Sequence, residues 1–246
     1  MANWNDPQPR SGFGASPSLG SRTAGRAGYD AGLRRHMLSI YNYMSSGVLL
    51  SGIVALLFAR SGMAAQIAGT PLWWIIALAP LGFVFGMSFG ANRMSTTTLQ
   101  AMFWGFATVM GLSLSTIFLV FTATSIASTF FATAAAFAGL SLVGYTTKKD
   151  LSGMGSFMIM GLIGILVATL INLFVQSSAL QMGISVLGVL IFAGLTAYDT
   201  QRLKNEYQVL AGTEFAGKAV ILGALSLYLD FINMFQFLLS FMGQRD

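Results

Sequence analysis

Seven long runs of apolar residues constrain this chain more than any other feature of its sequence. A helix needs about 20 apolar residues to cross a bilayer, and the runs have that length. Open strands would leave backbone groups unpaired in lipid, and the alternating pattern of a membrane barrel is absent. The sequence therefore predicts an all-α integral membrane protein with seven transmembrane helices, at residues 37–58, 72–89, 99–121, 125–143, 154–174, 180–198 and 219–242.

The composition excludes a water-soluble globule. Hydrophobic residues make up 55% of the 246 residues and charged residues only 9%, whereas a soluble domain carries about a quarter charged residues. The net charge of +5 is modest, and no basic run interrupts the apolar part of the chain. We therefore expect a lipid bilayer as the surroundings and no nucleic-acid partner.

The first 35 residues differ from the rest of the chain. They are rich in Gly, Ser, Pro and Arg and poor in aliphatic residues, so they cannot bury enough apolar surface to fold alone. They also lack the apolar segment and the cleavage site of a signal peptide. We predict a disordered basic cytoplasmic tail over residues 1–35 and a seven-helix transmembrane domain over residues 36–246. Asp30 is the expected N-cap of a helix that continues into the first span.

The positions of Arg and Lys predict the orientation in the membrane. With seven spans, all but two of the 13 basic residues lie on the side of the N-terminus, namely Arg10, Arg22, Arg26, Arg34, Arg35, Arg93, Lys148, Lys149, Arg202, Lys204 and Lys218. The other side holds Arg60 and Arg245. Because basic residues concentrate on the cytoplasmic side, the N-terminus is expected inside and the C-terminus outside.

Two acidic residues at or inside the apolar segments are the strongest candidates for a functional site. Asp199 closes the sixth segment in LTAYDTQRLKNEY, and Asp230 lies within the seventh in SLYLDFINMF. A charge at the bilayer centre costs a few kcal/mol and persists mainly where it faces the bundle interior and finds a partner. Ser226 and Asn233 share a helix face with Asp230. This polar stripe is therefore expected to point inward.

Simpler interpretations of the same residues stay open at this point. Asp199 lies one turn before Arg202, so it could be an interfacial residue paired with that arginine. Asp230 could be a neutral structural hydrogen-bond donor. Arg93 follows the second span in FGANRMS. It is either a loop arginine that fixes the orientation or an arginine that bends back toward the carboxylates.

The residues of common catalytic sites are missing from the sequence. There is no cysteine, and the single histidine, His36, precedes the first span, so neither a His-ligated metal cluster nor a Ser–His–Asp arrangement can be assembled. No phosphate-binding glycine pattern occurs. We expect no enzyme activity and no cofactor.

Two segments together resemble the signature of the Bax inhibitor-1 family of membrane proteins. They are AYDTQRLKNEY, which closes the sixth span, and LSLYLDFINMFQFLLSFMG in the seventh, and the resemblance covers about residues 30–246. It implies seven helices, with the last one central and surrounded by the other six. It also implies that Asp199 and Asp230 form a hydrogen-bonded pair, the pH sensor of a calcium leak. Arg93 matches an arginine that latches the first aspartate in the closed state.

The expected function is a pH-sensitive, calcium-permeable leak channel in a bacterial inner membrane. Two carboxylates close together in a low dielectric cannot easily both ionise, so they would share a proton. Deprotonated, Asp199 and Asp230 would attract a hard cation such as Ca²⁺ through their oxygen atoms.

Two alternatives to the leak channel stay open. One is a non-transporting regulatory protein that binds a membrane-protein partner, for instance a modulator of a membrane protease or of a stress response. The other is a proton-coupled ion exchanger that uses the same carboxylates. Calcium flux through purified protein would discriminate a channel from the regulatory protein.

The charge distribution makes a prediction about topology. A reporter that is active only in the cytoplasm should be inactive when it is fused after residue 246 and active when it is fused before residue 1, because the two ends are expected on opposite sides of the membrane. Activity of the C-terminal fusion on folded, full-length protein would contradict the predicted orientation.

Overall fold

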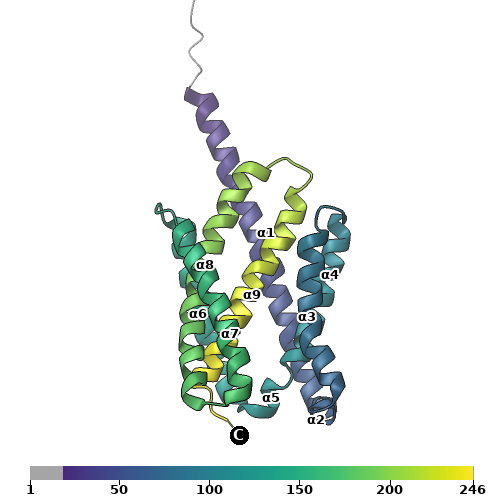
Figure 1. Cartoon of the computed structure of the whole chain (residues 1–246). Coiled ribbons are helices and arrows are strands. Elements are labelled where there is room, and N and C mark those ends of the chain that lie inside the picture. The colour runs from purple at the N-terminus through teal and green to yellow at the C-terminus, as the bar shows by residue number, and fades with distance from the viewer. Residues whose placement is uncertain (1–18, 246) are drawn as a thin grey trace, which may run out of the picture. The chain divides into compact units, whose positions relative to one another are not determined.

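The computed structural model describes residues 19–245, and these residues form nine helices (Figure 1). Seven segments are long and apolar enough to cross a membrane, which confirms the predicted number of spans and the all-α class. The third span consists of a long helix and a short one. The helices are α1 (Leu19–Arg60), α2 (Met63–Ile67), α3 (Pro71–Gly90), α4 (Thr96–Leu114), α5 (Ile117–Val120), α6 (Ala123–Thr146), α7 (Ser152–Val175), α8 (Ser178–Leu210) and α9 (Ala216–Met242).

The first helix begins earlier than the sequence predicts. It starts at Leu19, so Asp30 lies inside α1 and the prediction that Asp30 caps its N-terminus is wrong. Residues 19–35, which we assigned to a disordered tail, are helical in this structure. For residues 1–18, which lie outside the described residues, disorder stays a prediction. The chain divides into two units between Arg35 and His36, and the description below concerns the second unit.

The sixth spanning helix is also longer than predicted. The apolar run ends at Tyr198, but α8 continues to Leu210 because residues 201–210, QRLKNEYQVL, consist mostly of good helix formers. Arg202 and Lys204 therefore belong to a helix and not to a loop. The connection to α9 is reduced to residues 211–215.

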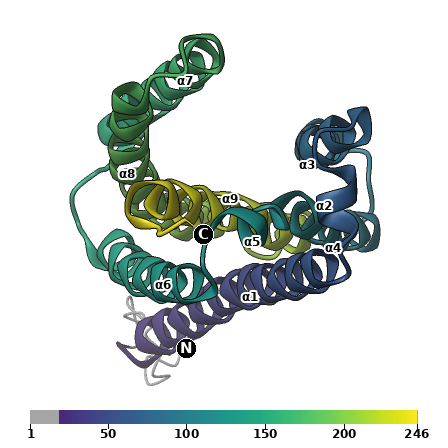
Figure 2. The same cartoon turned by 90° about the horizontal axis from the view of Figure 1, so that it is seen from below.

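The last helix is the most buried of the seven spans. Within the apolar part of α9, 61% of the residues are buried, compared with 6% to 33% in the other spans. Figure 2 shows α9 in the middle, with α8, α6, α1 and α4 around it. Its partners include α8, α6, α4 and α3, whereas α7 packs on α8. A complete ring of six helices around α9 stays a prediction.

Polar contacts fix α9 to its neighbours in addition to apolar packing. Near its N-terminus, Lys218 Nζ donates a hydrogen bond to the carbonyl oxygen of Ala91, after α3, at 3.0 Å. Halfway along, the Tyr228 hydroxyl lies 2.6 Å from Ser51 Oγ of α1, which itself donates to the carbonyl oxygen of Ala107 in α4 at 2.7 Å. Both Ser51 and Tyr228 are fully buried. Three helices thus meet at one hydrogen-bonded point.

The long helix α8 holds the connection between α6 and α7. The Gln201 amide donates to the carbonyl oxygen of Lys149 at 2.8 Å and accepts from the backbone N–H of Leu151 at 2.9 Å. Lys204 Nζ donates to the carbonyl oxygen of Tyr145 in the last turn of α6 at 2.7 Å. These bonds satisfy backbone groups that a helix end leaves unpaired.

At the opposite end of the bundle, the residues after α9 pair with the α5–α6 corner. Phe121 and Arg245 form an antiparallel bridge, and the backbone N–H of Thr122 donates to the carbonyl oxygen of Gln244 at 3.1 Å. The backbone N–H of Gln244 donates to Ser125 Oγ at 2.9 Å. We refer to residues 243–245 as the C-terminal clasp.

Close packing of α6 on α8 makes a prediction about stability. A methyl group at Gly144 would overlap the carbonyl oxygen of Ala197, whereas one at Gly139, on the same helix, would meet nothing within 4 Å. We expect Gly144→Ala to lower the free energy of unfolding by about 1–3 kcal/mol through overpacking. Gly139→Ala should change it by no more than about 1 kcal/mol. Unfolding in mixed detergent micelles measures both, and equal stability of the two variants would contradict this packing.

Candidate functional site: the buried aspartates of α8 and α9

The two aspartates singled out by the sequence lie on helices that pack against each other. Asp199 belongs to the second half of α8 and Asp230 to the middle of α9. Both residues are buried, with exposed fractions of 6% for Asp199 and 5% for Asp230. The inward orientation predicted for Asp230 is therefore confirmed, and Asp199 is buried within the bundle as well.

Asp199 has two partners, one from each helix. Its Oδ1 lies 3.3 Å from Nη1 of Arg202, three residues further along α8, in an ion pair. Its Oδ2 accepts a hydrogen bond from the Ser226 hydroxyl of α9. Arg202 Nη2 in turn donates to Ser226 Oγ at 3.1 Å. The three side chains close a triangle that connects α8 to α9.

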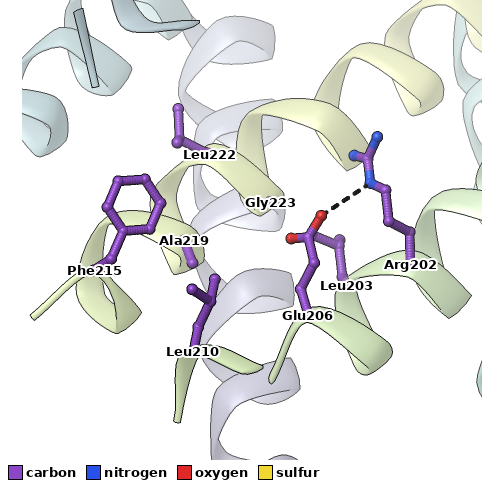
Figure 3. Close-up of a pocket in the computed structure, with 8 residues that line it drawn as sticks. All are labelled: Arg202, Leu203, Glu206, Leu210, Phe215, Ala219, Leu222 and Gly223. Atoms are coloured by element: carbon purple, nitrogen blue, oxygen red, sulfur yellow. Dashed lines mark ion pairs between the residues drawn. The ribbon is translucent and has the colours of Figure 1, made fainter. Parts of the chain in front are cut away.

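Glu206 extends this network toward the surface. Its Oε1 lies 3.4 Å from Nε of Arg202, a charge contact without hydrogen-bond geometry. Figure 3 shows the two side chains approaching each other at the wall of a pocket of about 320 Å³ between α8 and α9. Arg202 and Glu206 also line a second pocket, of about 290 Å³, together with Tyr198.

Asp230 is the unsatisfied member of the site. Its Oδ2 is buried and has no hydrogen-bond partner among the described residues. The predicted hydrogen bond between the two carboxylates is not formed in this structure, because the carboxylate of Asp199 is engaged by Arg202 and Ser226. A buried carboxyl without a partner is costly as an anion, so this position suits a proton, a water molecule or a cation.

The other predicted site residues, Asn233 and Arg93, have no described hydrogen bond or ion pair with the carboxylates. Asn233 donates its side-chain amide to the carbonyl oxygen of Leu229 on its own helix, at 2.7 Å. Arg93 is exposed in the turn between α3 and α4. Within residues 31–245, the described ion pairs to carboxylates are those of Arg202, and none joins Arg93 to Asp199. The latch role of Arg93 stays a prediction.

Sequence reasoning placed Arg202 outside the site and did not consider Glu206. The pairing of Asp199 with Arg202 was considered only as an alternative to a functional role, and the structure contains this pair, with Asp199 buried and Arg202 partly exposed. The i, i+3 and i+4 spacing of Asp199, Arg202 and Glu206 was the available signal. The polar stripe predicted on the seventh span includes Ser226, but no sequence pattern shows that this residue of α9 bonds to Asp199 of α8.

A bound calcium ion would need more ligands than the two aspartates provide. Among the described residues there is no group of three or more His, Cys, Asp or Glu side chains that could hold a metal ion. Calcium takes six to eight oxygen ligands, and water molecules or carbonyl groups can complete the set. Asp199, Asp230 and the Ser226 hydroxyl are the oxygen donors that this site supplies.

The fold and the site together define an α-helical membrane protein with carboxylates buried inside its bundle. Residues 33–246 match the family described as Inhibitor of apoptosis-promoting Bax1. The chain belongs to this family, the Bax inhibitor-1 family, which confirms the resemblance seen in the two aspartate segments.

Similar proteins occur in several bacteria. A protein of Caulobacter vibrioides is 48% identical over 227 residues, which cover 87% of this chain and 90% of that protein. The inner membrane protein YbhL of Escherichia coli K12 is 44% identical over 219 residues, covering 87% of this chain and 94% of YbhL. A protein of Rickettsia prowazekii is 44% identical over 218 residues, which cover 88% of this chain and 92% of that protein.

The triangle between α8 and α9 makes a prediction about stability. Ser226→Ala removes the hydroxyl that contacts both Asp199 and Arg202, so we expect a loss of about 0.5–1.5 kcal/mol in the free energy of unfolding. Ser240 lies on the same helix and its side chain has no hydrogen bond within the described residues, so Ser240→Ala is the matched control. Unfolding in mixed micelles measures both, and an unchanged Ser226→Ala protein would show that the triangle adds no stability.

Proposed function

We propose that this protein is a pH-sensitive, calcium-permeable leak channel of a bacterial inner membrane, gated by Asp199 and Asp230. The observation that carries the proposal is the burial of two carboxylates on adjacent helices, together with the buried Oδ2 of Asp230, which has no hydrogen-bond partner among the described residues. Ionisable residues inside membrane bundles are rare and usually mark ion or proton pathways. The bacterial relatives, among them one named an inner membrane protein, support the location.

The charge of the site depends on its protons. With both aspartates ionised, the described ion pair to them is that of Arg202 with Asp199, so the site carries an excess of negative charge and attracts a hard cation. With a proton on the pair, the negative excess disappears and the attraction is lost. The leak is therefore expected to increase as the pH rises and to decrease as it falls. No covalent step is part of this proposal.

Two pockets support a route between the site and one side of the membrane. Both are lined by Arg202 and Glu206, and the first extends along Leu203, Leu210 and Phe215 toward the end of α8 (Figure 3). Under the predicted orientation, this end faces the cytoplasm. An ion that enters either pocket meets the charged end of Arg202 before it reaches Asp199.

The test of this proposal is calcium flux through purified protein in liposomes loaded with a calcium-sensitive dye. The leak of the wild-type protein should decrease as the pH is lowered. Asp199→Asn and Asp230→Asn keep the side-chain volume but cannot titrate, so each should flatten the pH dependence. Glu214→Gln is the matched control, because Glu214 is exposed in the α8–α9 connection and its exchange removes the same charge without touching the site.

The double variant separates a coupled pair from two independent carboxyls. Because groups that share a proton titrate together, the effects of the two single exchanges on the pH profile should not add. If Asp230→Asn flattens the pH profile and Asp199→Asn does not, Asp230 would be a single sensor and Asp199 the structural partner of Arg202. If liposomes that contain the wild-type protein retain calcium as well as protein-free liposomes do, the result would favour a regulatory protein over a channel.

A further inference from the structure

The guanidinium of Arg202 contacts three different side chains at once. Nη1 lies 3.3 Å from Asp199, Nη2 donates to Ser226 at 3.1 Å, and Nε lies 3.4 Å from Glu206. A planar guanidinium with donors along its edges can serve several acceptors together, whereas a lysine ammonium acts as a single point charge. Three contacts determine both the position and the plane of the group.

Arg202 also lies at the boundary between the pockets and the buried carboxylate. It contributes to the walls of both pockets, one on the α9 side and one next to Ser152 of α7. Its side chain is 38% exposed, whereas that of Asp199 is 9% exposed. The guanidinium therefore covers the approach to Asp199 with a positive charge.

We propose that Arg202 is a tethered cation that closes the Asp199 end of the site, and that Glu206 is the positioning residue that holds it there. An incoming divalent cation has to displace the guanidinium from Asp199 before it can reach the oxygen atoms of the pair. The contact is an autoinhibitory device built into α8. This inference rests on the proposed function where it concerns ion flow, but the closure itself can be tested without any flux.

The absence of cysteine from the sequence makes a direct test possible. In Ser226→Cys, the only thiol of the protein takes the place of the hydroxyl that contacts both Arg202 and Asp199. Its rate of reaction with a neutral and with a cationic methanethiosulfonate reagent, on purified full-length protein at one fixed pH, reports both coverage and local charge. Gel filtration and circular dichroism establish that each variant is folded.

The reaction rate of the Ser226→Cys protein is compared with the rates of four double variants, each of which carries one further exchange. We expect Arg202→Gln to raise the rate with the cationic reagent roughly two- to fivefold, since a partly exposed ion pair is a weak closure. Arg202→Lys keeps the charge but not the three contacts, so its rate should lie between the rate with Arg202 in place and the rate with Arg202→Gln. Glu206→Gln should give a smaller rise, because the arginine loses one anchor. Lys148→Gln removes the same charge from an exposed loop residue and should leave the rate unchanged.

The outcomes separate this inference from rival explanations. Equal rates with Arg202→Gln and Lys148→Gln would overturn it, and Arg202→Lys supplies a second variant if Arg202→Gln fails to fold. Arg93→Gln is measured in parallel. If the reaction rate rises with Arg93→Gln but not with Arg202→Gln, the closing residue lies in the α3–α4 turn, and this result would also overturn the proposal.

The last measurement is the calcium leak from liposomes that contain the wild-type protein, Arg202→Gln or Lys148→Gln. A higher leak with Arg202→Gln than with Lys148→Gln supports closure of an ion path. If the wild-type protein and Arg202→Gln both hold calcium, the proposed channel function fails. The thiol rates still decide whether Arg202 covers Asp199.

Discussion

The contact between α8 and α9 is the constraint on which the arrangement of this site depends. A carboxylate inside a membrane bundle needs a partner in a fixed position, and here the partners of Asp199 come from both helices. Small or flexible side chains let the neighbouring helices approach closely, as Gly144 of α6 does at Ala197 of α8. The packing thus determines which polar atoms meet, and the polar contacts then hold the helices at that depth.

The two aspartates occupy unequal surroundings in spite of their similar burial. Asp199 has an arginine and a hydroxyl next to it, whereas Oδ2 of Asp230 has no hydrogen-bond partner within the described part of the chain. A symmetric pair would divide its charge equally, but here the compensation is all on one side. Arg202, the partner of Asp199, lines both pockets, whereas neither aspartate lines them.

Much of the fold followed from composition, because a bilayer leaves few options for the backbone. Seven apolar runs predicted seven spans, and an acid within such a run predicted burial, as found for Asp230. The length of α8 was missed because residues 201–210 are polar, and hydropathy does not distinguish a helix that leaves the membrane from a loop. Helix propensity would have indicated the extension.

The site was predicted less completely, since its contacts join residues of different helices. Helical spacing placed Ser226 on the face of Asp230, but its bond to Asp199 depends on the rotation and depth of α9 against α8. The same spacing included Asn233, which bonds to its own helix instead. The resemblance suggested Arg93 as the cation near Asp199, whereas Arg202, only three residues away along α8, occupies that place in this structure. Local spacing was the better guide to the charge partner.

The C-terminal clasp has a mechanical consequence for the whole bundle. One end of α9 is bonded through Lys218 to the residue that follows α3, and the other end continues into residues 243–245, which pair with the α5–α6 corner. A sliding or turning movement of α9 along its axis would break hydrogen bonds at both ends together. The helices α3 and α7, in whose most apolar stretches only 11% and 6% of the residues are buried, have fewer buried contacts to break. A rearrangement that leaves α9 in place would thus break the fewest buried contacts.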